Sequence, residues 1–470
     1  MSQAEPATEG PPTHQPYPRR WAALALVGVA QFMLILDITV VAIAMPQLGA
    51  DLGMGRDALT WVMSAYTLAF GGLMLTGGRL ADVVGPRRIV LIGLAIFTVA
   101  SLAAGLADHA ALVLAARVAQ GVGAALMSPA ALSTVVRLFA GEELNRALGI
   151  WSALGGVGAA VGVLVGGVLT AGPGWPWVFL VNVPIGAVIL IGLPALLPTL
   201  PPLSAGARLD LAGALLGTLA FGSVIFACID AGNTGIASPR PLGALAVSLL
   251  LFLALGAWLR RHPQPLVDPA LVARRPVLAG SIVLFVGTGL MVAVFFLGTF
   301  YLQAAAGHDA LTTGLLFLPV AVATMGGAQT AGRAIGPLGV RTVAVIGLLL
   351  AGAGLAVAAL GSGTTTVVVA TSVGSAGLGA LFVVASVTVL SSVAHAEAGI
   401  ASGLLSSFHE LGAALGAALM SGVAAASLTG TTAVGFQRGY AVAAGIALVA
   451  AVMAWVLLRP SAPPQEDTTP

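Results

Sequence analysis

The chain has 470 residues, of which 58% are apolar and only 8% are charged, and its mean hydropathy is +1.04. Soluble domains carry about 25% charged residues, so this composition excludes an ordinary soluble protein and predicts a polytopic helical protein embedded in a lipid bilayer. The net charge of +2 predicts no nucleic-acid partner, because the charged residues fall in short segments between long apolar runs.

The chain begins with a polar, Pro-rich stretch that predicts a disordered cytoplasmic tail over residues 1–20. An apolar run then extends to Pro46. A signal peptide has an apolar core of about 7–15 residues and a small-residue cleavage site. Because this run is longer and lacks such a site, we expect a retained first transmembrane helix.

Charged residues and Gly/Pro breaks divide the chain into fourteen predicted transmembrane spans, each near the length of about 20 residues that crosses a bilayer. The first eight are 21–46, 58–77, 88–107, 111–133, 147–170, 177–197, 209–229 and 242–259. The other six are 278–303, 312–332, 341–360, 365–391, 400–424 and 438–458. The runs are continuous and too long for β-barrel strands, which alternate in polarity over about ten residues.

The arginines predict the orientation, since cytoplasmic segments of membrane proteins are rich in basic residues. With the N-terminus inside, the outer loops hold only Arg56, Arg240 and Arg438, Arg117 lies within a span, and the other arginines fall inside. We therefore expect an even number of spans in the inner (cytoplasmic) membrane, with both termini in the cytoplasm.

Three charged residues lie deep within predicted spans, where a charge is costly unless it is paired or functional: Asp37, Arg117 and Glu410. Asp37 lies roughly 24 Å from the inner end of the first span, and Arg117 roughly 9 Å from the outer end of the fourth. In a hydrocarbon core of about 30 Å these depths nearly coincide. The two side chains are therefore candidates either for proton coupling or for a static polar contact.

The segment 77–88 is a charged, Gly-punctuated loop between the second and third spans, and it recurs in the second half of the chain. Its Gly78, Arg79, Gly85 and Arg87 are repeated as Gly332, Arg333, Gly339 and Arg341, each 254 residues later. Both copies have the same spacing and lie on the predicted cytoplasmic side of the membrane. This predicts two halves of parallel topology, as in known transporters. Chance in a Gly-rich chain is the alternative, and Asp82 has no acidic counterpart.

The fifth span carries Gly158, Gly162 and Gly166 at a spacing of four residues, followed by Gly167. Small residues at this spacing form a stripe along which helix backbones approach closely. The stripe predicts tight helix packing, with a sliding contact as a further interpretation.

Glu410 lies near the midplane of the predicted span 400–424, and its neighbour His409 points about 100° away around the helix. We expect only one of the two to face a cavity. Glu410 is a candidate for a second titrating or cation-binding site, and the alternative is a hydrogen bond between helices. Gln31, Gln120 and Asn182 are further polar candidates for a cavity, or contacts that hold helices together.

The sequence offers no catalytic arrangement of Ser, His and Asp and no phosphate-binding loop, so we expect neither an enzyme nor an ATP-driven pump. The six His are scattered and Cys228 is the only cysteine, which predicts no metal site and no intrachain disulfide.

Several of these segments together resemble the major facilitator superfamily, specifically its fourteen-helix drug:proton antiporter branch. Leu36–Pro46 resembles the first-helix motif of the branch, although Ala42 replaces the usual Asn. Arg117–Ala125 is similar to the fourth-helix motif. Trp175–Gly186 is similar to the sixth-helix pattern, with Pro176 in place of a common Arg.

The segment 77–88 resembles the superfamily signature between the second and third helices. It keeps the signature residues Gly78, Asp82, Gly85, Arg87 and Arg88, while Val83 and Pro86 stand where basic residues are common. The glycine stripe resembles the antiporter motif, but Val163 replaces its usual Pro.

The resemblance implies an all-α fold of two six-helix bundles with two inserted central helices. The implied domains are residues 21–200, the inserted pair 201–262, a cytoplasmic linker 263–277, the second bundle 278–458 and a cytoplasmic tail 459–470.

The resemblance also implies a monomeric, proton-driven exporter of lipophilic drugs or antibiotics without a cofactor, working by alternating access. Asp37, tuned by Arg117, would couple to protons. The cytoplasmic ends of the bundles would be held together by a latch, for which a passive topology anchor is the alternative. The latch residues would be Gly78, Arg79, Asp82, Gly85, Arg87 and Arg88. A symporter of a metabolite, a membrane-embedded transferase and a channel remain alternatives.

Overall fold

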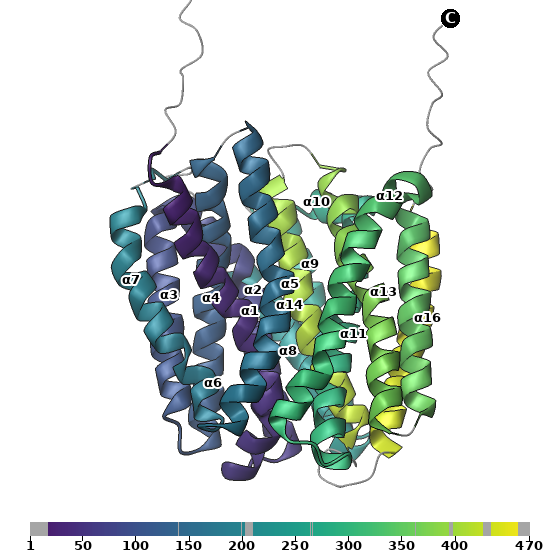
Figure 1. Ribbon diagram of the computed structural model, residues 1–470. Coiled ribbons are helices and arrows are strands. Elements are labelled where there is room, and N and C mark those ends of the chain that lie inside the picture. Colours follow the sequence, from purple (N-terminus) through teal and green to yellow (C-terminus); the bar gives the residue numbers. More distant parts are fainter. Residues whose placement is uncertain are drawn as a thin grey trace, which may run out of the picture.

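The computed structural model describes residues 17–139, 141–198, 200–202, 210–263, 265, 267–361, 363–393, 398–425 and 434–458. The described chain is built of helices that run side by side with nearly parallel axes (Figure 1). Residues 1–16 and 459–470, which make up most of the two predicted tails, lie outside the described residues, as do 203–209.

The helices of the first half follow one another with short connections. They are α1 (Arg20–Asp51), α2 (Arg56–Val84), α3 (Pro86–Gly105), α4 (Ala110–Leu138), α5 (Gly141–Ala171), α6 (Pro176–Leu180) and α7 (Asn182–Leu196). The middle of the chain holds α8 (Leu211–Thr234), α9 (Pro239–Arg261) and the short α10 (Pro269–Ala273). The second half holds α11 (Arg275–Phe300), the π-helix η1 (Tyr301–Ala305), α12 (Ala310–Leu360), α13 (Thr364–Leu390), α14 (Ala398–Val423) and α16 (Val434–Leu457).

Eleven helical segments of the described chain are long and apolar enough to cross a membrane. This result confirms the predicted all-helical membrane fold. The number of fourteen spans stays a prediction, as does the division into two bundles with an inserted pair.

The bundle has two ends, which serve as landmarks below. The terminal end contains the start of α1, the short α10 and the end of α16 (Figure 1). The far end contains the connections from α1 to α2 and from α8 to α9.

A single glycine reverses the chain between α2 and α3. Gly85 has φ 104° and ψ 133°, a conformation that side chains with a Cβ rarely adopt. Pro86 then starts α3, where the missing N–H costs nothing. The prediction of a loop over 77–88 is therefore wrong: residues 77–84 remain helical, because one residue suffices for the turn.

The same geometry occurs 254 residues later. Within α12, only Gly339 is non-helical, with φ 78° and ψ 155°, so that α12 comprises two helical arms. The predicted spans 312–332 and 341–360 lie on opposite sides of this glycine. Gly85 and Gly339 thus share both a place in the repeated sequence pattern and a left-handed backbone conformation.

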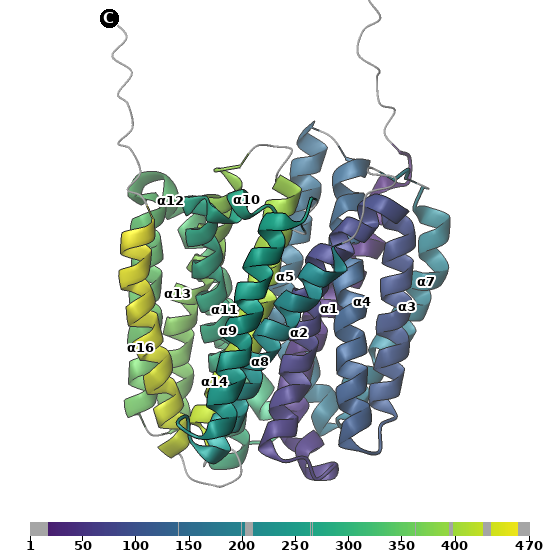
Figure 2. The ribbon, with the colours of Figure 1, turned by 180° about the vertical axis from the view of Figure 1, so that it is seen from behind.

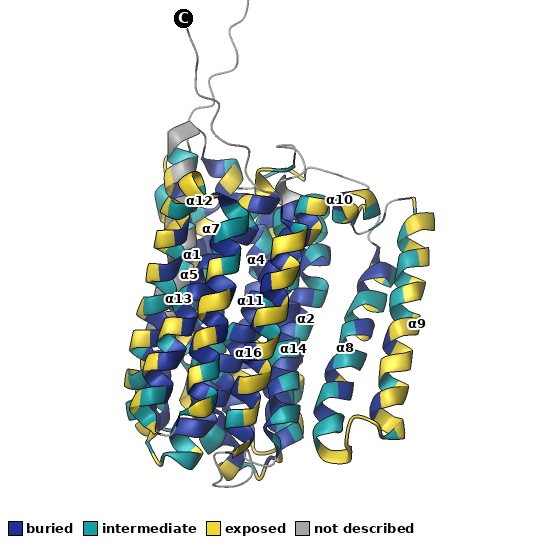
Figure 3. Cartoon of the chain, turned by 90° about the vertical axis from the view of Figure 1, so that its right-hand side faces the viewer, coloured by how far each residue is buried: buried dark blue, intermediate teal, exposed yellow. Residues whose placement is uncertain are grey.

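The pair formed by α8 and α9 lies on the outside of the bundle. Helix α8 packs against α2 and α14, which belong to different halves of the chain, whereas α9 packs on α8 (Figure 2). Only Pro241 and Ser248 of α9 are buried, and the other residues of the helix are exposed or partly exposed (Figure 3). Contacts between the two halves are also made by α5 and α12.

Replacing Gly339 by Ala is expected to destabilise the protein by about 1–3 kcal/mol, because a Cβ strains a backbone with positive φ. The thermal midpoint of the purified protein in detergent measures this loss. Gly243→Ala is the matched control, since a Cβ at that exposed helical position meets no atom within 4 Å. Equal midpoints for the two variants would contradict the assigned turn.

Candidate functional site

An ion pair between α1 and α4 forms the centre of the candidate site. Asp37 is fully buried and only 1% of Arg117 is exposed. Nη1 of Arg117 donates a hydrogen bond of 2.5 Å to Oδ2 of Asp37. The two residues expected at one depth are thus in direct contact, and each supplies the partner that a buried charge requires. Their role in proton coupling stays a prediction.

Two amides complete the surroundings of the Asp37 carboxylate. Nε2 of Gln120 donates to Oδ1 at 3.1 Å, and Nδ2 of Asn182 donates to the same oxygen at 2.9 Å. Gln120 also accepts from Arg117 at 2.9 Å and donates to Oγ of Ser101 on α3 at 2.8 Å. Helices α1, α3, α4 and α7 therefore meet in one connected polar cluster, which fixes the carboxylate.

The guanidinium of Arg117 is held from its other side by α2. Its Nε donates to the carbonyl of Val62 at 2.8 Å, and its Cζ lies 4.2 Å from the centre of the Tyr66 ring. This distance is typical of a cation–π contact. Neither Tyr66 nor Ser101 was predicted as a site residue, because an aromatic or hydroxyl side chain in a span usually indicates packing.

The glycine stripe of α5 packs against the segment of α1 that carries Asp37. A Cβ on Gly158 would lie 2.9 Å from the Ile35 side chain, and one on Gly166 would lie 3.0 Å from Cα of Val40. A Cβ on Gly162 would overlap Oγ1 of Thr39. The stripe therefore lets α5 approach α1 closely beside the ion pair.

Gly167 faces the second half of the chain instead. A Cβ there would lie 2.9 Å from the carbonyl of Ala310 on α12, and one on Gly314 would lie 2.8 Å from the carbonyl of Val163. These glycines place α5 and α12 in backbone contact near the far end of the bundle.

Glu410 lies on α14 and is 6% exposed. Its Oε1 is 3.1 Å from Nδ1 of His409, so the two neighbouring side chains meet. Its Oε2 is buried and has no hydrogen-bond partner among the described residues. His409 is more exposed, at 34% of its side chain, and its ring lies 5.5 Å from that of Phe382.

Tyr66 links the surroundings of Glu410 to the ion pair. Its phenol lies close enough to Asp37, Arg117 and Glu410 to interact electrostatically with all three. The backbones of α2 and α14 are also close, since a Cβ on Gly71 would lie 2.7 Å from Cβ of Glu410. Gln31 is not joined to this cluster by any hydrogen bond found in the described chain, and its Oε1 is buried without a partner.

The segment predicted as a latch contacts its own half of the chain. Nη2 of Arg87 donates to the carbonyl of Pro194 at 2.7 Å. Asp82 interacts electrostatically with Arg79 and Arg137. Gly78 faces Pro129 of α4, and Arg88 is exposed. The role of this segment as a latch between the halves stays a prediction.

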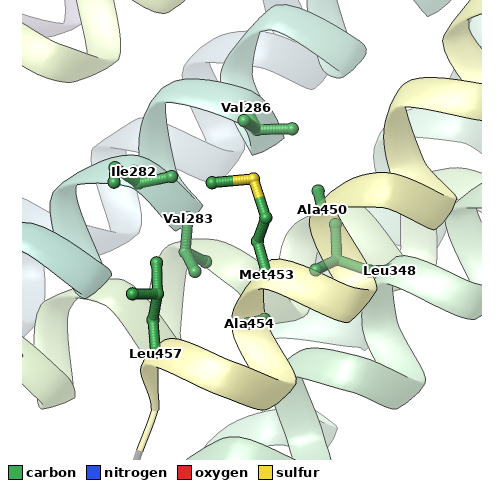
Figure 4. Close-up of a pocket in the computed structure, with 8 residues that line it drawn as sticks. All are labelled: Ile282, Val283, Val286, Leu348, Ala450, Met453, Ala454 and Leu457. Carbon is green, nitrogen blue, oxygen red and sulfur yellow. The ribbon is translucent and has the colours of Figure 1, made fainter.

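A small pocket lies elsewhere, between α11, the second arm of α12 and α16 (Figure 4). It is lined by Ile282, Val283, Val286, Leu348, Ala450, Met453, Ala454 and Leu457. Its side chains bear no charge and no hydrogen-bond donor, so it offers nothing to bind a polar ligand. Within the described ranges, no group of three or more His, Cys, Asp and Glu is placed to hold a metal ion.

Comparison with known proteins gives consistent results. The model of the Major Facilitator Superfamily matches residues 27–417. The puromycin resistance protein of Streptomyces alboniger is 37% identical over 469 residues, which cover 94% of this chain and 92% of that protein. The cephamycin export protein of Amycolatopsis lactamdurans is 36% identical over 430 residues, covering 87% and 86%. The crystal structure of the nucleoside transporter NupG matches with a TM-score of 0.67 at 14% identity, covering 94% of this chain and 100% of that one, which shows a shared fold.

Replacing Arg117 by Gln is expected to cost about 3–5 kcal/mol of stability, because it leaves the buried Asp37 carboxylate without its counterion. Thermal unfolding in detergent measures the loss. The double variant Asp37→Asn/Arg117→Gln should lose less than the sum of the two single variants.

Arg240→Gln is the control for this experiment, since the Arg240 side chain is 69% exposed and lies 3.6 Å from Asp230. Its loss should not exceed about 1 kcal/mol. Additive losses for the Asp37 and Arg117 variants would show that the pair contributes no coupling energy.

Proposed function

Since the chain belongs to the Major Facilitator Superfamily, a superfamily of membrane transporters and not of enzymes, we propose that it exports antibiotics or other lipophilic drugs in exchange for protons. The match confirms the resemblance predicted from the motifs. Two of its relatives are named for resistance to puromycin and for export of cephamycin, which supports export of a drug by this chain.

The observation that carries proton coupling is the buried ion pair of Asp37 and Arg117. A carboxylate that accepts three hydrogen bonds from one guanidinium and two amides is stable while it is ionised. Protonation would remove its charge and weaken the bonds to α4 and α7. Uptake of a proton at Asp37 would therefore loosen the contacts between the helices of the first half, and its release would restore them.

Glu410 is proposed as the second site for a proton or a cationic drug. Its Oε2 is buried and has no partner in the described part of the chain, and α14 faces α2 of the other half. A protonated amine on the substrate would supply the missing donor. Binding there would place the substrate between the halves, close to Tyr66 and the ion pair.

The orientation follows from the arginines, which we propose place the terminal end in the cytoplasm and the chain in the inner membrane. The far end would then face outward, and there α5 contacts α12 at Gly167 and Gly314. The contact of α2 with α14 includes the far end but continues along both helices, as far as Leu75 and Gly403. At the terminal end, Gly332 and Gly336 of α12 have no neighbouring atom within 4 Å of an added Cβ. The contact between the halves at the far end and the open space beside Gly332 and Gly336 at the terminal end both support a conformation closed toward the outside.

In the same scheme, residues 78–88 would latch the halves together only after the far end opens. In the present conformation Nη2 of Arg87 donates to the carbonyl of Pro194, which belongs to the first half. The latch and the far-end contacts would therefore alternate during transport.

The Asp37→Asn variant tests the coupling. In inverted membrane vesicles with an acidic lumen, addition of puromycin or a cephamycin should release protons through the parent protein but not through this variant. A pH-sensitive dye in the lumen reports the change. Asp268→Asn, which alters an exposed carboxylate, is the control and should behave as the parent. Proton release that persists in Asp37→Asn contradicts the coupling role, and substrate-driven acidification of the lumen would indicate a symporter.

The Glu410→Gln variant tests the second site. Export of a lipophilic cation should fall by about tenfold or more, since loss of a charged contact of about 1.4 kcal/mol has that effect. Export of a neutral compound of similar size should change by less than about twofold. Uptake into inverted vesicles measures both rates. An equal fall for both compounds would show that Glu410 does not select the charge of the substrate.

A further inference from the structure

Arg56, which the sequence places in an outer loop, is buried at the far end of the bundle. It is the first residue of α2 and only 6% exposed. Its side chain does not reach outward from the helix but inserts between α8 and α14. The sequence position of Arg56 therefore predicted the end of the bundle at which it lies, but not the helices that surround it.

The guanidinium of Arg56 binds groups from both of these helices. Nη2 donates to the carbonyl of Ile229 at 2.8 Å and to Oδ1 of Asn233 at 2.7 Å, both on α8. Nη1 donates to the carbonyl and the hydroxyl of Ser421 on α14, at 3.1 and 3.3 Å. An ion pair of 2.7 Å with Asp57 provides the countercharge.

Arg56, Asp57, Asn233 and Ser421 form what is called here the far-end clasp. Nδ2 of Asn233 donates to Oδ2 of Asp57 at 2.7 Å, which closes a ring of polar contacts. One turn further along α2, the Thr60 hydroxyl contacts the Ser421 hydroxyl. The clasp thus joins a helix of the first half, a helix of the second half and the intervening α8.

The backbones around the clasp leave little free space. A Cβ on Gly232 would lie 2.6 Å from Nη1 of Arg56 and 2.8 Å from Cα of Gly422. Below the clasp, Ile225 and Ile229 of α8 form a buried apolar cluster with Ala414 and Ala418 of α14. Since the guanidinium lies against packed backbone on both sides, its hydrogen bonds exist only while the three helices are together.

We propose that Arg56 is a positioning residue that holds the far end closed, with α8 as its anchor across the seam between the halves. This inference rests on the proposed alternating access, in which the far end must open. The contacts of the clasp are made in the closed state and are broken when α2 and α14 separate. Their removal must therefore shift the population toward the open state.

The proposal also gives the α8–α9 pair a part in transport. Helix α8 supplies two of the acceptors of Arg56, so it stabilises the closed far end rather than only adding lipid-facing surface. Asp230 and Arg240 form an ion pair of 3.6 Å at the same end. Asp230 also lies near enough to Arg56 to attract its charge, although no hydrogen bond between the two is found in the described residues.

A cysteine pair measures the closed population directly. Thr60→Cys and Ser421→Cys, in a chain whose only other cysteine is removed by Cys228→Ser, place two thiols where the hydroxyls now touch. An oxidant should cross-link them rapidly, and the disulfide should stop transport until a reductant is added. Adding Arg56→Gln should slow cross-linking by about tenfold, the effect of losing about 1.4 kcal/mol of closed-state stabilisation.

Two further variants keep the test decisive. Asn233→Ala removes one acceptor without leaving a buried charge and should slow cross-linking by a smaller factor, even if Arg56→Gln does not fold. Arg240→Gln is the matched control and should leave the rate unchanged. Equal rates in the parent, Arg56→Gln and Asn233→Ala would overturn the proposal, as would an equal slowing by Arg240→Gln.

The cross-linking rate needs no substrate and no proton gradient. A chain that cross-links as expected but moves no drug even in its reduced form would refute the proposed function and leave the closed-state role of Arg56 standing. A chain that exports drugs with unchanged cross-linking in the clasp variants would refute the role of Arg56 alone.

Discussion

A carboxylate inside a membrane-embedded bundle is stable only if protein groups replace the water that it has lost. Asp37 meets this requirement with one guanidinium and two amides, and the packing of the first half is arranged accordingly. Four helices contribute to its cluster, and α2 supports Arg117 through the carbonyl of Val62. The glycine stripe then allows α5 to lie directly on the same part of α1. Much of the architecture of the first half thus depends on one buried charge.

The two buried acids differ in how completely they are satisfied. Asp37 has a partner for each of its oxygens, whereas Glu410 has one oxygen without a partner among the described residues. A carboxylate whose two oxygens both accept hydrogen bonds is suited to hold helices together until its charge changes. A carboxylate with one oxygen left without a donor is suited to accept a hydrogen bond from a group outside the protein. Tyr66 lies within electrostatic range of both acids.

Sequence reasoning predicts most where a simple periodic rule applies. The length of apolar runs gave the helical membrane fold, and the rise per residue put Asp37 and Arg117 at one depth. It fails where the answer depends on which neighbour fills a given space. Ser101 and Tyr66 are ordinary residues of a span until α3 and α2 are placed beside Arg117. The sequence places Arg56 in an outer loop, but only the folded chain shows that α8 and α14 enclose it. The segment 77–84 looked like a loop because it is charged, but a helix end that lies at a membrane surface tolerates such residues.

The reversals at Gly85 and Gly339 have a mechanical consequence. Each joins two long helices through one residue with a fixed left-handed conformation, so the joint contains no slack that a longer linker would provide. The two helices on either side of each glycine are therefore mechanically coupled. A displacement of one helix is transmitted to the other instead of being absorbed in the connection. Motions of this chain are accordingly carried by paired helices moving as units, with the softer joints located elsewhere.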